Sequence, residues 1–188
     1  MSLRVLGGNF RGRLLQSPRG AQTRPTTSML RKAVFDILQP SISDANFLDL
    51  FAGSGAMGIE ALSRGAKHST FVENHQETLK CLKQNLAALQ IESNATVFTY
   101  EVFDALKKLE KKEEHFDIIY ADPPYNKKSV YLDLLTFLDS STLMKKGSIL
   151  FLESLSPAPF ESINLEHLVA IDQRRFATSL LHQYYYAR

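Results

Sequence analysis

The 188-residue sequence contains a single cysteine, Cys81. One thiol cannot build a disulfide framework, and it cannot supply the several cysteines of a zinc site within one chain. Histidines do not replace them as ligands, because the five histidines do not show metal-ligand spacing. The sequence therefore excludes disulfide-rich and cysteine–zinc proteins, and we expect no metal.

Long apolar runs are absent as well. No stretch approaches the length needed to cross a membrane. The first residues carry arginines but no apolar core of a secretory signal, so we expect a cytoplasmic protein. Hydrophobic residues make up 44% and charged residues 22% of the chain, which is typical of a globular domain. This length is enough for one domain with a full core.

Acidic residues are missing from residues 1–35, which hold seven basic side chains, whereas the rest of the chain has 15 basic and 20 acidic ones. A basic block on an acidic body predicts a polyanionic partner such as nucleic acid. The arginines that we expect to contact RNA phosphates are Arg4, Arg11, Arg13, Arg24 and Arg31. Arg31 and Lys32 lie between the apolar positions of a predicted helix, so we expect both side chains to point outward.

The most informative stretch is residues 47–58, Phe-Leu-Asp-Leu-Phe-Ala-Gly-Ser-Gly-Ala-Met-Gly. An apolar strand runs into glycines at Gly-x-Gly-x-x-Gly spacing, and a helical pattern follows. Such a turn brings the backbone close to a ligand and offers N–H groups at a helix start. The motif fits a dinucleotide site, with Glu73 about 20 residues further on, or an S-adenosylmethionine (SAM) site, with Asp49 ahead of the glycines.

Strands alternate with helices from Asn46 onward. The predicted strands cover residues 47–51, 68–73, 95–100, 116–121, 148–153, 168–176 and 180–186. No crossover helix fits between the last two, which must therefore be antiparallel. The pattern predicts an α/β fold, a Rossmann-like, mostly parallel seven-stranded sheet with a C-terminal antiparallel strand. Ligands bind such sheets beyond the carboxyl ends of the strands.

Residues 1–40 are expected to form a small basic extension, and residues 41–188 the main domain. Residues 3–16 predict a hairpin that turns at Gly7-Gly8-Asn9. A helix follows, capped by Thr26 or Thr27 and stopped by Pro40. The extension has too few apolar residues for its own core, so we expect it to pack on the main sheet.

A second turn, Asp122-Pro123-Pro124-Tyr125, follows the strand at residues 116–121. Prolines cannot continue a ladder, so carbonyl groups here can face a ligand. Asp122 and the Pro123 carbonyl can accept the two hydrogens of an amino group on a heterocycle, and Tyr125 can stack on its ring. Orienting the nitrogen lone pair would favour attack on an electrophile.

Together, these two turns resemble the amino-group class of SAM-dependent methyltransferases, which have the class I fold. With Arg4-Val5-Leu6-Gly7-Gly8, Arg24-Pro25-Thr26 and the stretch from Glu60 to Ala66, the whole chain resembles the bacterial 16S ribosomal RNA guanine-N2 methyltransferases. The resemblance runs from about Arg4 to about Tyr186.

The resemblance implies a residue for each part of the cofactor. The methionine end of SAM would be bordered by Asp49, Ala52, Gly53 and Gly55. Glu73 would accept from the ribose hydroxyls, Asn74 would lie beside the adenine, and Asp104, followed by Ala105, would bind the adenine amine. Phe103 departs from the pattern, which often has glycine there. The target guanine would be held by Asp122, Pro123 and Tyr125.

We therefore expect a SAM-dependent methyltransferase acting on a guanine of 16S ribosomal RNA, within a small ribosomal subunit or an assembly intermediate. Three alternatives stay open: an adenine-N6 DNA methyltransferase, an NAD-dependent oxidoreductase, and an RNA-binding assembly factor without catalysis. The short chain, with no separate target-recognition domain, argues against the first. Nothing in the sequence supplies a hydride-transfer partner for the second.

Overall fold

The computed structural model describes residues 3–18, 25–124, 128–158 and 163–188. Its seven strands form one sheet in the order β3-β2-β1-β4-β5-β7-β6. The strands are β1 (Asn46–Leu50), β2 (His68–Val72), β3 (Ala95–Phe98), β4 (Phe116–Ala121), β5 (Met144–Leu155), β6 (Leu168–Phe176) and β7 (Ser179–Tyr186). The predicted α/β sheet is confirmed, because β1 to β5 run parallel and β7 is antiparallel to both β5 and β6.

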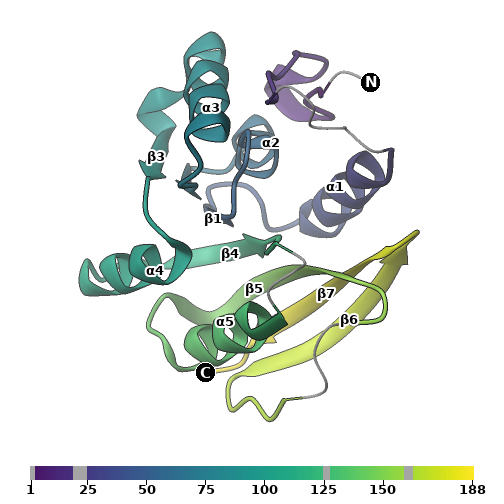
Figure 1. Ribbon diagram of the computed structural model, residues 1–188, viewed down its shortest axis with the longest axis vertical. Coiled ribbons are helices and arrows are strands. Elements are labelled where there is room, and N and C mark those ends of the chain that lie inside the picture. Colours follow the sequence, from purple (N-terminus) through teal and green to yellow (C-terminus); the bar gives the residue numbers. More distant parts are fainter. Residues whose placement is uncertain (1–2, 19–24, 125–127, 159–162) are drawn as a thin grey trace.

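Helices cover both faces of the sheet (Figure 1). They are α1 (Pro25–Leu38), α2 (Ala56–Ser63), α3 (Gln76–Leu89), α4 (Val102–Lys111) and α5 (Lys128–Ser140), with short 3₁₀ turns η1 (Gly8–Phe10) and η2 (Glu92–Asn94). One core cluster joins α1, α2 and α3 to one face of the sheet, and a second joins α4 and α5 to the other. Neighbouring residues Phe47 and Leu48 belong to different clusters, as the two-residue period of a strand requires.

The predicted hairpin at residues 3–16 is present in reduced form. It has one isolated antiparallel bridge, between Arg4 and Leu14, and η1 forms its turn. Backbone hydrogen bonds from Val5 to Arg13 and from Leu15 to Leu3 hold its arms together. A regular ladder does not form because the turn docks on α2: a Cβ on Gly8, whose φ is 72°, would overlap the Ser63 carbonyl.

The N-terminal segment packs on the main sheet, as expected. Buried Val5 and Leu15 of the segment, with Leu30 and Phe35 of α1, belong to the same core cluster as Phe47 of β1. Helix α1 begins at Pro25, so Thr26 and Thr27 lie inside the helix and not at its cap position. Figure 1 shows the N-terminal segment beside α2, at the edge of the molecule away from α5.

Candidate active site

The two turns singled out in the sequence meet at the carboxyl edge of the sheet. Strand β4 lies beside β1, with Asp49 opposite Tyr120 and Leu50 opposite Ala121. Asp122, which follows β4, and Gly53, in the loop after β1, line the same cavity of about 360 Å³. Turns about 70 residues apart in the sequence therefore converge at one edge of the sheet.

The glycine loop between β1 and α2 has a left-handed backbone at Gly53, where φ is 57°, and no atom lies within 4 Å of a Cβ placed there. A ligand can therefore approach the backbone at this residue. Gly58 serves packing instead, because a Cβ there would overlap the Phe71 ring of β2. Asp49, Ala52 and Gly53 line the cavity, whereas Gly55, with φ 85°, leads into α2 and does not.

The N–H groups of the loop are turned inward. Glu73 accepts the N–H of Gly53 at 2.8 Å with one carboxylate oxygen and the N–H of His75 at 2.7 Å with the other. The Gly55 N–H bonds to the Ala52 carbonyl at 2.8 Å. The N–H groups of Gly53 and Gly55 therefore fix the shape of the loop.

Asp49 is a buried carboxyl at the end of β1, with 1% of its surface exposed. It accepts the Gly58 N–H at 2.9 Å. Burial raises the pKa of Asp49 to about 7; the bond from Gly58 lowers this pKa and the charge of Glu73 raises it. A cation in the cavity would favour the ionised form of Asp49.

A second cavity, of about 210 Å³, lies beside the first. Phe51 lines both of them and has a left-handed backbone, with φ 62°. Glu73 and Asn74 line the second cavity together with Glu101, which accepts the Asn74 side-chain amide at 2.6 Å. Tyr100 adds an aromatic ring to its wall. The second cavity thus combines acceptors, a donor and flat apolar surface.

The structure corrects the placement of Asp104 and Ala105. Asp104 is exposed on α4, Ala105 is fully buried in the core, and neither lines either cavity. Glu101 and Val102, at the start of α4, line the second cavity instead. The helix begins at Val102, and Asp104 and Ala105 follow within its first turn, one exposed and one in the core.

The turn after β4 is described up to Pro124. Asp122 lines the first cavity and Pro124 the second. Pro123 is buried, lines neither, and its carbonyl accepts the Tyr131 hydroxyl at 3.5 Å. Its predicted contact with a substrate amine thus stays a prediction. Tyr125 lies outside the described residues.

Two residues of the first cavity were not found from the sequence. Glu153 of β5 accepts the Tyr120 hydroxyl at 2.8 Å, and both side chains are buried. Burial first, and then the charges of Glu153 and Asp122, raise the pKa of Tyr120 well above its ordinary value, so its hydroxyl remains a donor. The available signal was an acidic residue near the end of an apolar strand, as at Glu73.

The predicted RNA-binding arginines fall into three groups. Arg4, Arg11 and Arg13 are exposed, as a phosphate-contacting surface requires. Arg24 lies outside the described residues. Arg31 is only 4% exposed and lines the first cavity, so the expectation that it points outward is wrong, whereas Lys32 is 67% exposed.

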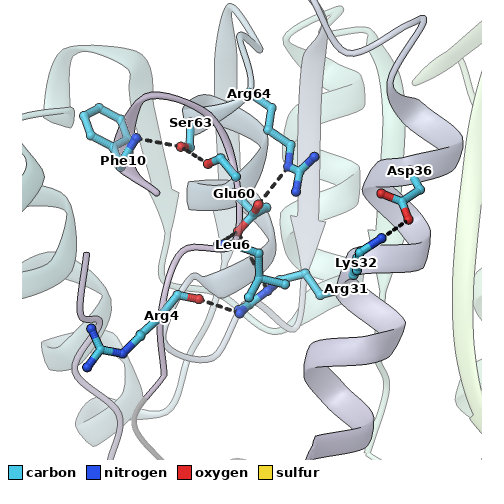
Figure 2. A network of polar contacts seen from close by, with 10 residues as sticks. Arg4, Leu6, Phe10, Arg31, Lys32, Asp36, Glu60, Ser63 and Arg64 are labelled. Atoms are coloured by element: carbon cyan, nitrogen blue, oxygen red, sulfur yellow. Dashed lines mark hydrogen bonds and ion pairs between the residues drawn. The ribbon is translucent and has the colours of Figure 1, made fainter. Parts of the chain in front are cut away.

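Arg31 turns inward because of a buried carboxylate on α2 (Figure 2). Glu60 is fully buried, accepts the Leu6 N–H and the Arg64 side chain at 2.7 Å each, and lies 3.9 Å from Nε of Arg31. Arg31 also donates to the Arg4 carbonyl at 2.6 Å. Glu60 therefore ties α1 and the N-terminal segment to the helix that follows the glycine loop.

Within the described residues, no helix combines the length and apolar character needed to cross a membrane. In the same described part of the chain, no group of three or more His, Cys, Asp or Glu side chains could hold a metal ion.

The fold and site define the class of protein. A SAM-dependent methyltransferase from Agrobacterium tumefaciens has the same fold, with a TM-score of 0.64 at 15% identity over 87% of this chain and 63% of that one. This chain has the Rossmann-like fold of SAM-dependent methyltransferases, with a glycine loop after β1 and an Asp-Pro-Pro turn after β4.

The family follows from closer relatives. A family model described as Conserved hypothetical protein 95 matches residues 3–185. Ribosomal RNA small subunit methyltransferase D of Escherichia coli K12 is 36% identical over 152 residues, which cover 81% of this chain and 74% of that protein. The Escherichia coli protein yhhF superposes with a TM-score of 0.86, at 29% identity over 100% of this chain and 99% of that one. The chain belongs to this family of ribosomal RNA methyltransferases.

Proposed function

We propose that this protein transfers a methyl group from SAM to the exocyclic N2 amine of a guanine in 16S ribosomal RNA, in the cytoplasm. A small ribosomal subunit or an assembly intermediate is the proposed substrate. The observation that carries the proposal is that Asp122 and Gly53 line one cavity. The Asp122 carboxylate, which can bind an amine, and the glycine loop, which can bind the cofactor, thus line the same cavity.

The residues present fit this cofactor. Asp49, Asp122 and Glu153 bring three carboxyl groups to the first cavity, and SAM carries positive charge on its sulfonium and ammonium groups. The second cavity offers Glu73 for ribose hydroxyls and Tyr100 beside a flat base. Because Phe51 lines both cavities, one extended molecule can occupy the two. When bound, SAM supplies an electrophilic methyl group.

The chain's own residues orient the amine. The lone pair of an exocyclic amine is delocalised into the ring, so the nitrogen attacks poorly unless it is positioned. The Asp122 carboxylate can accept an amine hydrogen and aim the lone pair into the cavity. The same carboxylate lies where it can take the proton that the nitrogen loses on methylation. Tyr120, held by Glu153, supplies a fixed hydroxyl dipole beside this position.

The target base must leave its stack to reach Asp122 at the sheet edge. Arg4, Arg11 and Arg13 are exposed on the segment whose neighbouring residues Leu3 and Ser17 line the first cavity. Phosphates bound by these arginines would lie next to the site and set the register of the RNA. The basic surface and the cavity therefore suit one continuous RNA strand.

Labelled SAM and small ribosomal subunits lacking the modification test the proposal. We expect label in RNA, recovered as N2-methylguanosine after digestion to nucleosides. Asp122→Asn keeps the shape of the side chain but removes its charge, so we expect kcat to fall by about 10²-fold or more. SAM affinity should change much less, because Asp122 acts on the amine.

The matched control is Asp133→Asn, the same change at an exposed position of α5. It should leave kcat and SAM affinity unchanged. Failure to label RNA would refute the proposed activity. In a parallel reaction with duplex DNA, label recovered as N6-methyladenosine would replace the guanine assignment. Full activity of Asp122→Asn would remove Asp122 from the mechanism.

A further inference from the structure

The N-terminal segment forms part of the wall of the first cavity. Leu3, Ser17 and Pro18 line this cavity together with Gly53 and Ser54 of the glycine loop. The two walls come from parts of the chain more than 30 residues apart. The relative position of these two walls therefore decides how much space a substrate has beside the glycine loop.

The side chain of Asn85 on α3 joins these two walls. Its Oδ1 accepts the Gln16 N–H at 2.7 Å, and its Nδ2 donates to the Gln16 carbonyl at 3.0 Å. The same Nδ2 donates to the Ser54 carbonyl of the glycine loop at 2.9 Å. Asn85 is 3% exposed, so water competes little for these bonds.

The arrangement at Gln16 resembles one rung of a sheet ladder. A carboxamide offers a donor and an acceptor in one plane, and Asn85 uses both on the backbone of a single residue. This fixes the chain one residue before Ser17 and Pro18, which line the cavity. The bond from Nδ2 of Asn85 to the Ser54 carbonyl fixes Gln16 relative to the glycine loop.

The other end of the segment is held separately, on α2. Glu60 accepts the Leu6 N–H and Ser63 accepts the Phe10 N–H at 2.9 Å, and Ser63 donates to the Gly7 carbonyl (Figure 2). These bonds secure the turn of the hairpin and would survive a change at Asn85. Beyond the buried Leu15, the chain that enters the cavity wall is held by the bonds of Asn85 to Gln16.

We propose that Asn85 is a positioning residue for methyl transfer, and that it couples the cofactor loop to the N-terminal wall of the cavity. This rests on the proposed function. The bonds of Asn85 connect the Ser54 carbonyl of the glycine loop to the backbone of Gln16, so a contact of the cofactor with the loop would be transmitted to Gln16. The N-terminal wall is thereby set at its working distance once the cofactor is bound.

Hydrogen exchange tests the coupling directly. In the unaltered protein, S-adenosylhomocysteine should slow exchange at the Gln16 amide, whose acceptor is Oδ1 of Asn85. In Asn85→Ala the amide should exchange fast with or without this ligand. Asn85→Asp keeps the acceptor for the Gln16 N–H but loses the donor to the Gln16 and Ser54 carbonyls, so exchange at Gln16 should no longer respond to the ligand.

Kinetics test the positioning role. A shift of about 1 Å in a positioned group can cost 10²-fold in rate, so we expect both Asn85 variants to lose about 10- to 10²-fold in kcat. KM for the RNA should change less than about threefold, because the arginines that bind phosphates are not altered. The control is Asn94→Ala, which removes an exposed bond to the Lys67 carbonyl away from both cavities.

The outcomes separate this inference from the proposed function. If the unaltered protein transfers no methyl group, the proposed function fails, and hydrogen exchange still reports the coupling. If it is active and Asn85→Asp keeps full kcat, the positioning role is wrong. A purely structural role would lower the melting temperature while leaving kcat unchanged below it. Unchanged Gln16 exchange on ligand binding to the unaltered protein would overturn the coupling, even if Asn85→Ala fails to fold.

Discussion

Near neutral pH, the Asp49 carboxyl group is a mixture of its protonated and ionised forms. Burial raises its pKa to about 7, while an ordinary aspartate is ionised well below this. The folded protein without ligand therefore binds a proton that the unfolded chain releases between about pH 4 and 7. The contribution of Asp49 to stability is largest at the acid end of this range and is lost as the pH rises toward 7.

The same carboxyl predicts a pH dependence of cofactor binding. Ionised Asp49 attracts the positive charges of SAM, so a proton on Asp49 competes with the cofactor. Affinity should weaken by up to about tenfold for each pH unit below 7, in the range where an α-amino group stays charged. Isothermal titration with SAM between about pH 5.5 and 7 measures this slope.

The control for this prediction is Asp49→Asn, which keeps the Gly58 contact position but cannot titrate. This variant should bind SAM weakly, with no slope over the same pH range. A flat profile in the unaltered protein, or an equal slope in Asp49→Asn, would show that another group controls binding.

The sequence was enough to place residues at strand ends, but not enough to place the side chains of residues on helices. Asp49, Gly53 and Asp122 were found because strand ends place them at one edge of the sheet. Arg31 and Asp104 were misjudged, because helical spacing gives a face but not what that face meets. Only the docking of α1 against Glu60 reveals that Arg31 points inward.

At the level of elements, α2 is the helix on which the N-terminal segment and α1 are anchored. Its Glu60 is fully buried and compensated by Arg31 and Arg64. Burial lowers the pKa of Arg31 from its ordinary value, and the charge of Glu60 opposes this shift. The negative charge of Glu60 therefore favours the ionised form of Arg31 at this buried position.

Removal of this anchor should be costly. Glu60→Ala leaves the Arg31 guanidinium buried without its anion and the Leu6 N–H without its acceptor, so the free energy of unfolding should fall by about 3–5 kcal/mol. Urea titration followed by circular dichroism measures the loss.

An exposed pair in the same view serves as the control (Figure 2). Lys32 and Asp36 approach to 2.6 Å on α1 but remain 67% and 53% exposed. Asp36→Ala should therefore cost no more than about 0.5 kcal/mol. Equal losses in the two variants would mean that Glu60 contributes no more than a surface ion pair.

The strands of the sheet were predictable, including the mostly exposed edge strand β6, whereas the bounds of β5 and the ladder of the hairpin were not. Strand β4 was predicted within its observed bounds, but β5 extends from Met144 to Leu155, beyond the predicted 148–153. Pairing with β7 extends its far end to Leu155. The hairpin at residues 3–16 kept a single bridge, because contacts with α2 and α3 replace its own ladder.

At the scale of the whole molecule, the basic and acidic parts of the sequence share one core. The predicted boundary at residue 40 marks a change of charge, yet one core cluster contains Val5, Leu30 and Phe47 on both sides of it. The N-terminal segment also forms part of the wall of the first cavity. Folding of the extension and of the main sheet should therefore be coupled.

Thermal unfolding tests this coupling, and we expect one cooperative transition, with equal calorimetric and van't Hoff enthalpies. S-adenosylhomocysteine at 100 times its Kd adds about 2.7 kcal/mol of stability, so the whole transition should rise by about 5–10 °C. NAD at the same concentration is the control and should produce no shift. Two transitions, of which only the later one responds to S-adenosylhomocysteine, would mean that the N-terminal segment folds apart from the cavity it lines. A shift with NAD alone would return the glycine loop to the dinucleotide-binding class.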